Sequence, residues 1–243
     1  MARSLEARLG ELVAGAWPAP STKDMGGWLL RHADGVTKRA NSVLPWGDPG
    51  DVGAAVERAE RFYTELGLPT VFSLDAHAQP QGIDKLLEGR GYELVDPTIA
   101  MATELSGPYE RDGVEIAEAP SSDWLDLWWS VDGRYDHQLP MAEKILTGVP
   151  AGYASLDGVA VGRGVPQGEW LGIYAMTVAP DARRRGLGRR VLRALLGWGR
   201  EQGCESAYLV VVERNAPART MYASEGFAEA GGYHYRVKNV TDR

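Results

Sequence analysis

Residues 170–203 place a strand, a glycine-rich turn and a helix in immediate succession, and this order constrains the fold more than any other stretch of the chain. Residues 171–178 are apolar and β-prone, whereas the apolar residues from Leu187 onward recur at helical spacing. The turn that joins the two elements has the sequence Arg-Arg-Arg-Gly-Leu-Gly at positions 183–188. The chain therefore passes directly from a strand to a helix N-terminus, as is typical of an α/β protein.

The composition of this turn favours an anion. At a helix N-terminus, unpaired backbone N–H groups and the positive end of the helix dipole both stabilise negative charge. Gly186 and Gly188 have no side chain that would obstruct a ligand, and the three arginines add planar donors that match phosphate. The turn is therefore predicted to bind a pyrophosphate group.

The wider pattern matches a known family. A strand that ends in Val178-Ala179-Pro180 precedes the R-x-x-G-x-G turn, and Asn215, Ala218 and Tyr222 follow it. This pattern resembles the GNAT superfamily of acyl-CoA-dependent N-acyltransferases. The resemblance implies that the turn holds the pyrophosphate of coenzyme A and that the central strand, where it splays from its neighbour, pairs with the pantetheine arm. The residues that it implies at the acetyl-CoA site are Met176, Thr177, Val178, Arg183, Arg184, Arg185, Gly186, Leu187, Gly188, Arg189, Asn215, Arg219 and Tyr222.

The same resemblance implies that Tyr222 is the general acid that protonates the departing thiolate, since a phenol with a reference pKa of about 10 can do so at close range. The sequence leaves open which group deprotonates the amine. Glu169 starts the central strand and Glu213 ends the next one, and both are candidates beside a water chain and His234. Asn215 is equally consistent with a helix N-cap, and Arg219 with a solvated surface position.

Acceptor recognition is expected from residues 121–138, because the family builds one wall of its cleft from its first helices. Trp124 and Trp128 share a helical face with aspartates around them, and aromatic faces with carboxylates suit a cationic amine. The alternative is a tryptophan stripe that faces the core. The acceptor is expected to be a primary amine of a small molecule or of a lysine.

Other phosphate-binding motifs fit less well. The chain contains no G-x-x-x-x-G-K-[ST] sequence, which argues against a P-loop nucleotidase. A dinucleotide-binding turn is an outside alternative, because Glu213 lies about where the ribose-binding acid would follow. That motif needs a third glycine where this chain has Val191.

Composition argues against several further classes of function. A formal charge of -7 argues against general nucleic-acid binding, which needs a basic face. No apolar run is long enough to cross a bilayer, and charged residues such as Arg3 and Glu6 interrupt the N-terminal stretch, so a cytoplasmic protein without a membrane partner is expected. One cysteine and four histidines without ligand spacing predict no metal site. The sequence leaves the oligomeric state open between a monomer and a homodimer.

The two halves of the chain repeat one order of elements: hairpin, turn, helix, strand, helix and a glycine-aromatic pair. Residues 42–45 match residues 177–180, and Gly91-Tyr92 matches Gly226-Phe227, both at an offset of 135 positions. The predicted fold is therefore α/β (α+β), with two GNAT-like domains that each have a mixed, mostly antiparallel central sheet flanked by helices.

The two domains are expected at residues 1–108 and 109–243, because Ser106-Gly107-Pro108 has the composition of a linker. In the first domain, Asp34-Gly35 predicts a hairpin whose second strand is residues 36–43; in the second, a closing pair of strands is expected through Val237. The first domain is expected to be degenerate, since the offset pairs Arg183 with Asp48, Gly186 with Asp51, Asn215 with Pro80 and Tyr222 with Leu87.

These patterns together predict an N-acetyltransferase that moves the acetyl group of acetyl-CoA to a primary amine by direct attack within a ternary complex. The second half would carry the reaction. The alternative from another class is a non-catalytic acyl-CoA sensor or scaffold that uses the same turn without turnover.

Overall fold

The computed structural model describes residues 5–133 and 136–239. The chain forms two compact units, one made of Met1–Ile99 with Gly231–Arg243 and the other of Ala100–Ala230. The change from the first unit to the second falls inside strand β5 (Glu93–Glu104), and the return falls inside strand β11 (Ala228–Lys238). Both crossings therefore occur within strands rather than in a linker.

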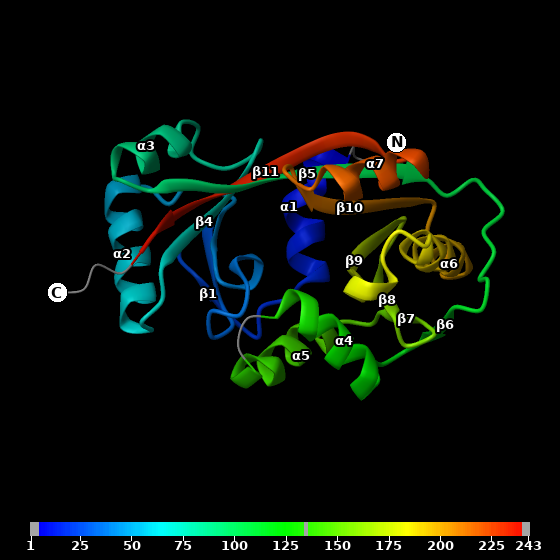
Figure 1. The fold of residues 1–243 in the computed structure, drawn as a ribbon. Helices are drawn as coiled ribbons and strands as arrows, with labels where there is room; N and C mark the ends of the chain where they lie inside the picture. Colours follow the sequence, from blue (N-terminus) through cyan, green and yellow to red (C-terminus); the bar gives the residue numbers. More distant parts are fainter. Residues whose placement is uncertain (1–4, 134–135, 240–243) are drawn as a thin grey trace. The chain divides into compact units, whose positions relative to one another are not determined.

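The second unit has a mixed sheet in which β9 has β10 on one side and β8 on the other, in the order β10-β9-β8-β7-β6 (Figure 1). Strands β9 and β10 are parallel, whereas β9-β8, β8-β7 and β7-β6 are antiparallel. The strands are β6 (Glu115–Ala117), β7 (Gly152–Leu156), β8 (Ala160–Gln167), β9 (Trp170–Val178) and β10 (Ser206–Val212). The helices are α4 (Ser122–Asp132), α5 (Leu139–Thr147), α6 (Leu187–Glu201) and α7 (Ala216–Ser224).

Helix α6 packs closely on one face of this sheet because glycines in β7 and β8 remove side chains from that face. A Cβ atom at Gly162 would lie 2.9 Å from Cγ1 of Val191, and one at Gly152 would lie 2.9 Å from Cη2 of Trp198. Helix α4 covers the other face, where Nε1 of Trp124 donates a hydrogen bond to the Ala154 carbonyl at 2.9 Å. The sheet is therefore sandwiched between an amphipathic helix and a tryptophan-bearing helix.

The first unit repeats this plan, in the order β1-β2-β3-β4-β11. Strands β3 and β4 are parallel, as β9 and β10 are, and the other neighbouring pairs are antiparallel. Apolar residues of β2, β3 and β4 form a buried cluster with helices α2 and α3. The strands are β1 (Ser21–Asp24), β2 (Trp28–His32), β3 (Val43–Pro45) and β4 (Thr70–Asp75), and the helices are α1 (Leu5–Ala16), α2 (Val52–Glu65) and α3 (Ile83–Gly89).

The predicted duplication is visible in local hydrogen bonds. Helix α3 ends with the N–H of Tyr92 donating to the carbonyl of Leu87 at 3.0 Å, and α7 ends with the N–H of Phe227 donating to the carbonyl of Tyr222 at 3.2 Å. The two pairs lie 135 positions apart. Helices α2 and α6 also begin 135 positions apart, at Val52 and Leu187.

Two predicted elements are wrong. Residues 36–43 do not form one strand: a short 3-10 helix, η1 (Lys38–Ala40), lies in the middle of the range, and the strand that pairs with β2 begins at Val43. The closing pair of strands is a single strand, β11, because its glycines do not make a turn. A Cβ atom at Gly232 would lie 2.6 Å from the carbonyl oxygen of Thr98, so this glycine allows a close backbone approach.

Candidate functional site

Strands β9 and β10 pair over only part of their length. Their parallel register runs from Trp170 opposite Ser206 to Ile173 opposite Leu209, yet β9 continues to Val178 and β10 to Val212. In the described part of the chain, the second half of β9 therefore has no strand partner on that side. Main-chain groups at such an edge can pair with an extended, amide-bearing ligand.

A β-bulge in β9 accompanies the separation. Arg163 of β8 lies opposite Tyr174 and Val161 lies opposite Thr177, so β9 uses three steps where β8 uses two. Ala175 takes up the extra residue with a φ of 51°, in the left-handed region that an L-residue seldom adopts. A bulge bends its strand and increases the local twist, so it accounts for the parting of β9 from β10.

The predicted turn leads to a helix N-terminus that no side chain caps. Gly186 is the N-cap of α6 with a φ of 79°, and it provides no side-chain hydrogen bond. By contrast, Asp51, Ser121 and Asn215 cap α2, α4 and α7 with their side chains. A Cβ atom built on Gly186 meets no heavy atom within 4 Å, so the space in front of these amides is open. The first N–H groups of α6 are therefore available to an anion.

The arginines of the turn differ in their surroundings. Nε of Arg183 donates to the Val178 carbonyl at 3.2 Å, which ties the turn to the end of β9. Arg184 and Arg185 are exposed, and Arg184 has a positive φ of 62°. Positive charge therefore surrounds the open end of α6 on the solvent side.

Arg189 contacts helix α7. Its Nε lies 2.8 Å from Oε1 of Glu225, and Nε of Arg193 lies 2.6 Å from Oε2 of the same carboxylate. Nη2 of Arg189 also donates to Oγ of Ser224 at 2.9 Å. The Glu225 side chain is only 6% exposed, so the two arginines of α6 hold the end of α7 through one carboxylate. The sequence gives no sign of this contact, because a glutamate after a helix is ordinary.

Helix α7 presents Tyr222 as a buried phenol. Tyr222 is 8% exposed, and its ring packs near that of Phe227 with centroids 6.1 Å apart. Burial, with a further contribution from the Asp132 carboxylate, raises the pKa of Tyr222 to about 12. The phenol is therefore protonated throughout the neutral range and is able to donate a proton or a hydrogen bond.

Asn215 and Arg219 have partners of their own. Oδ1 of Asn215 accepts from the N–H of Ala218 at 3.3 Å, which is the N-cap alternative that the sequence left open. Nη1 of Arg219 donates to the Glu213 carbonyl at 3.2 Å, and Nη2 donates to Glu229 at 2.7 Å. Both residues therefore fix the ends of α7.

The two predicted bases lie at opposite ends of the parallel strand pair. Glu213 is exposed just after the carboxyl end of β10, on the side where β9 and β10 part. Glu169 is exposed before β9, six residues ahead of the bulge at Ala175, which is about 20 Å along an extended strand. His234 belongs to the first unit, where Nε2 lies 3.0 Å from Oδ1 of Asp84.

The tryptophans of the predicted acceptor wall face the core. Trp124 is 2% exposed and Trp128 is 3% exposed, and Trp124 packs edge-on against Tyr153 with centroids 5.4 Å apart. The core-facing alternative is therefore confirmed for both residues. Residues 134–135 of the predicted wall lie outside the described residues.

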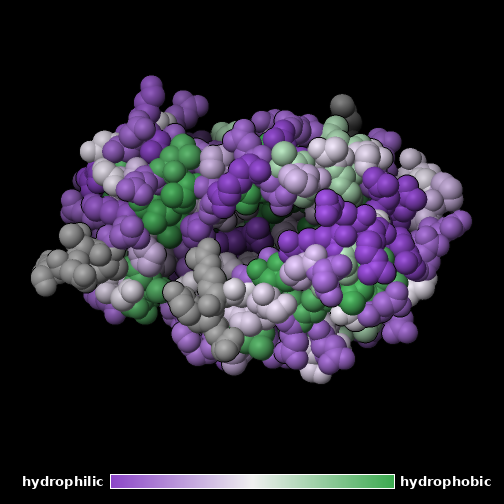
Figure 2. Space-filling model, viewed as in Figure 1, coloured by the Kyte–Doolittle hydropathy of each residue, from purple (hydrophilic) through white to green (hydrophobic). Residues whose placement is uncertain are grey.

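Within residues 5–133 and 136–239, no helix combines the length and the apolar character needed to cross a membrane, and no three His, Cys, Asp or Glu side chains are grouped to hold a metal ion. The face in Figure 2 is mainly hydrophilic, with hydrophobic residues in separate patches.

Comparison with known proteins agrees with this arrangement. The family model described as "Probable histone acetyltransferase Rv0428c C-terminal" matches residues 3–236. The uncharacterized N-acetyltransferase YobR of Bacillus subtilis (strain 168) is 31% identical over 243 residues, which cover 95% of this chain and 98% of that protein.

Solved structures show the same fold. A GCN5-related N-acetyltransferase from Kribbella flavida superposes with a TM-score of 0.67 at 18% identity, covering 99% of this chain and 98% of that one. A tandem GNAT protein from the clavulanic acid biosynthesis pathway superposes with a TM-score of 0.61 at 14% identity, covering 96% of this chain and 89% of that one. The chain belongs to the Rv0428c acetyltransferase family and is a GNAT N-acetyltransferase with a tandem GNAT fold.

Proposed function

We propose that the second unit transfers the acetyl group of acetyl-CoA to a primary amine, on a small molecule or a lysine, by direct attack within a ternary complex. The observation that carries the proposal is the parting of β9 from β10 beside the uncapped N-terminus of α6. An edge for an extended amide chain and a site for an anion lie at the same end of one strand, which matches the two parts of coenzyme A.

The donor would be held mainly by the main chain. The edge of β9 at residues 176–178 pairs with the pantetheine arm, and the N–H groups of residues 184–189 hold the pyrophosphate. Arg184 and Arg185 add charge from the solvent side. Arg189 acts indirectly, because its guanidinium is bound to Glu225.

Tyr222 would assist the leaving group. When bound, the thioester supplies an activated acyl group and a thiol leaving group. A phenol whose pKa is about 12 holds its proton firmly, so it gives up that proton only as negative charge develops on the sulfur. Until then it stabilises the sulfur through a hydrogen bond.

The acceptor amine must lose a proton before it attacks, since an alkylammonium has a pKa of about 10. Glu213 lies at the end of β10 where the strands part, whereas Glu169 lies at the far end of β9. We therefore assign proton removal to Glu213 or to water that it contacts. Glu169 has no part in this mechanism.

Only the second unit would bind the donor. Asp51, the equivalent of Gly186, places its own carboxylate on the N–H of Ala54 at 3.0 Å and so caps α2. A pyrophosphate at that helix would meet this carboxylate, and like charges repel strongly in a partly dry site. Leu87 stands at the position equivalent to Tyr222 and offers no proton.

An acceptor screen tests the proposal. The protein is incubated with acetyl-CoA and a panel of lysine peptides, polyamines, amino acids and aminoglycosides, and mass spectrometry detects acceptors that gain one acetyl group. The proposal predicts at least one acetylated acceptor, and formation of that product roughly 10²-fold more slowly with Tyr222→Phe. Tight coenzyme A binding without turnover on any acceptor would instead support the non-catalytic sensor.

A further inference from the structure

Two tyrosines meet where β9 parts from β10. Ile173, opposite Leu209, is the last residue of β9 in the parallel register, and Tyr174 is the residue that follows it. The hydroxyl oxygens of Tyr174 and Tyr208 lie 2.9 Å apart, and their rings pack edge-on with centroids 6.1 Å apart. The side chains of β9 and β10 are thus joined at the point where their main chains separate.

The Tyr174–Tyr208 pair is held from several sides. Tyr174 is 4% exposed and Tyr208 is fully buried, and the Tyr208 hydroxyl donates to Oε1 of Gln167 at 2.7 Å. A Cβ atom at Gly172 would lie 2.7 Å from Cε2 of Tyr174 and 2.9 Å from the hydroxyl oxygen of Tyr208. This glycine therefore makes room for the two side chains to meet, and their neighbours fix the position of the Tyr174 ring.

The ring of Tyr174 lies on the face of the sheet that α4 covers. Arg163 stands directly opposite Tyr174 on β8, and cross-strand partners share a face. The guanidinium of Arg163 lies over the ring of Tyr153, 5.9 Å from its centroid, and that ring packs against Trp124 of α4.

The other face of the sheet is filled at this level by α6 and by Met176 of β9. A Cβ atom at Gly162 would lie 2.6 Å from Sδ of Met176, 2.9 Å from Cγ1 of Val191 and 3.1 Å from Cδ1 of Leu195. These three side chains leave so little space that even one methyl group on the glycine would collide with them. Extra carbon atoms on this face would therefore force packed side chains to move, which is unfavourable.

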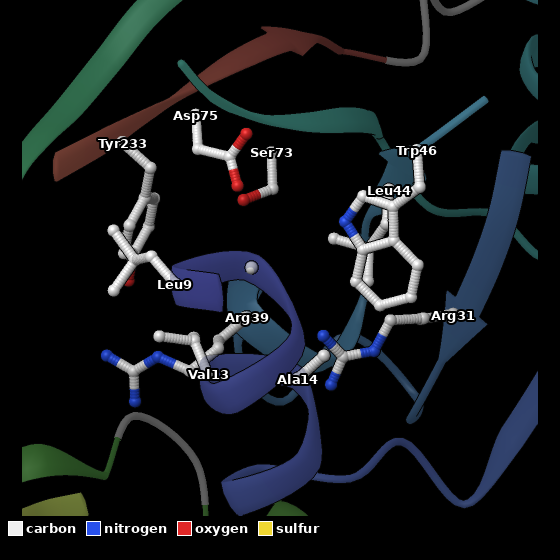
Figure 3. Close-up of a pocket in the computed structure, with 11 residues that line it drawn as sticks. Leu9, Val13, Ala14, Arg31, Arg39, Leu44, Trp46, Ser73, Asp75 and Tyr233 are labelled. Atoms are coloured by element: carbon white, nitrogen blue, oxygen red, sulfur yellow. The ribbon is translucent and has the colours of Figure 1, made fainter. Parts of the chain in front are cut away.

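The ring pair belongs to the second unit rather than to the repeated fold. Arg39 and Ser73 stand 135 positions before Tyr174 and Tyr208. Both of them line a cavity of about 20 Å³ in the first unit (Figure 3). The fold therefore does not require two aromatic rings at these positions, and the pair distinguishes the unit that is proposed to bind the donor.

The proposed donor would end at this pair. Along coenzyme A, the pyrophosphate is followed by the pantetheine arm, the thioester and the acyl group. With the pyrophosphate at the N-terminus of α6 and the arm along residues 176–178, the acyl group is directed towards residues 174–175, where β9 meets β10. Beyond this point the two strands are paired, so a longer acyl chain has to turn towards one face of the sheet. It meets Tyr174 on the α4 face and the crowded side chains on the α6 face.

We propose that Tyr174, held in place by Tyr208, limits the acyl group of the donor to acetyl. The ring acts through its volume, because it fills the space that the carbon atoms of an acyl chain beyond acetyl would need. The inference rests on the proposed function, since it uses the same donor site, and it adds the residue that determines acyl specificity.

Calorimetric titration of the full chain with acetyl-CoA and butyryl-CoA tests the inference without an acceptor. The wild type should bind acetyl-CoA at least about tenfold more tightly, because one methylene that does not fit a pocket costs on the order of tenfold. Tyr174→Val removes the ring and keeps a β-branched side chain that suits a strand. In this variant the difference between the two affinities should shrink to less than about threefold.

Two control variants separate ring volume from other effects. Tyr174→Phe keeps the ring and removes the hydroxyl, so it should keep the preference for acetyl-CoA. Leu156→Ala removes buried volume from β7, which β8 separates from β9, so it should lower the Tm and also keep the preference. Thermal unfolding shows that each variant is folded. If Tyr174→Val does not fold, Tyr174→Leu replaces it, because leucine keeps more of the buried apolar volume.

Each outcome bears on a different claim. Equal affinities for the two donors in the wild type, or an unchanged preference in a folded Tyr174→Val protein, would overturn the inference. A wild type that binds neither donor would contradict the proposed donor site, and the inference would fall with it. The expected preference without turnover on any acceptor would overturn acetyl transfer and would still support Tyr174 as the residue that selects the acyl group.

Discussion

Nε of Arg189, in the first turn of α6, lies 2.8 Å from Oε1 of Glu225, the residue that follows α7. Arg193, one turn further along α6, binds the other carboxylate oxygen. The helix whose N-terminus is open to an anion is thus tied directly to the helix that carries Tyr222. This contact gives the proposed donor site and the proposed acid a fixed mutual position.

Glu225→Gln keeps the shape of that side chain and removes its charge. Because α7 would be held less firmly, Tyr222 would be misplaced, and turnover should fall roughly tenfold while coenzyme A affinity changes less than twofold. Steady-state kinetics and calorimetry measure the two quantities. Glu57→Gln, which alters an exposed pair with Arg90 in the first unit, is the control and should leave turnover unchanged.

A double variant separates positioning from general destabilisation. If Glu225 acts through Tyr222, Glu225→Gln should cause little further loss of turnover in a Tyr222→Phe background. Fully additive losses would show that the carboxylate acts elsewhere.

Tyr222→Phe keeps the ring that packs near Phe227 and removes only the hydroxyl. Turnover should fall roughly 10²-fold, which is the scale of a lost general acid, while coenzyme A binding barely changes. Single-turnover acetylation and calorimetry check the two outcomes. A variant with the wild-type rate would remove Tyr222 from the mechanism.

The raised pKa of Tyr222 also predicts a dependence of stability on pH. The phenol titrates near pH 10 in the unfolded chain and at about 12 in the folded one. The folded state therefore keeps a proton that the unfolded state releases, so this group's stabilisation is complete below pH 10 and is lost as the pH rises towards 12. Denaturant unfolding at pH 9 and pH 11 should show a smaller alkaline loss of stability in Tyr222→Phe than in the wild type.

The sequence predicted the elements that have strong local patterns. Helix α6 was predicted from the helical spacing of its apolar residues, and strand β9 from its run of apolar, β-prone residues. The repeat accounts for α2 and α6 beginning 135 positions apart. Strand β1 was missed because Ser21–Asp24 is exposed throughout and has no alternating pattern. Strand β5 was missed because Asp96 and Pro97 lie within it, and both residue types are unfavourable in the middle of a strand.

The candidate site was predicted only where it depends on the main chain and on local motifs. The turn and Gly186 could be read from the sequence because glycine and helix start have local signatures. The Glu225 contact could not, since it joins residues on two helices. The burial of Trp124 depends on which face of α4 meets the sheet, which the helical pattern left open.

Gly186→Val tests the uncapped helix end. Gly186 has a φ of 79°, so a β-branched residue there is strained, and its side chain would occupy the space in front of the amides. Coenzyme A affinity should fall at least 10²-fold in a folded protein. Gly168→Val is the matched control, because Gly168 has a φ of 66° and equally open surroundings at the far end of β9.

Calorimetric titration of the full chain with coenzyme A tests the central claim most directly. The account predicts one molecule bound per chain, since Gly186 leaves the amides of α6 open while Asp51 caps those of α2, and it predicts that Gly186→Val weakens the binding at least 10²-fold. Two molecules per chain, or a single site of unchanged affinity in a folded Gly186→Val protein, would contradict it.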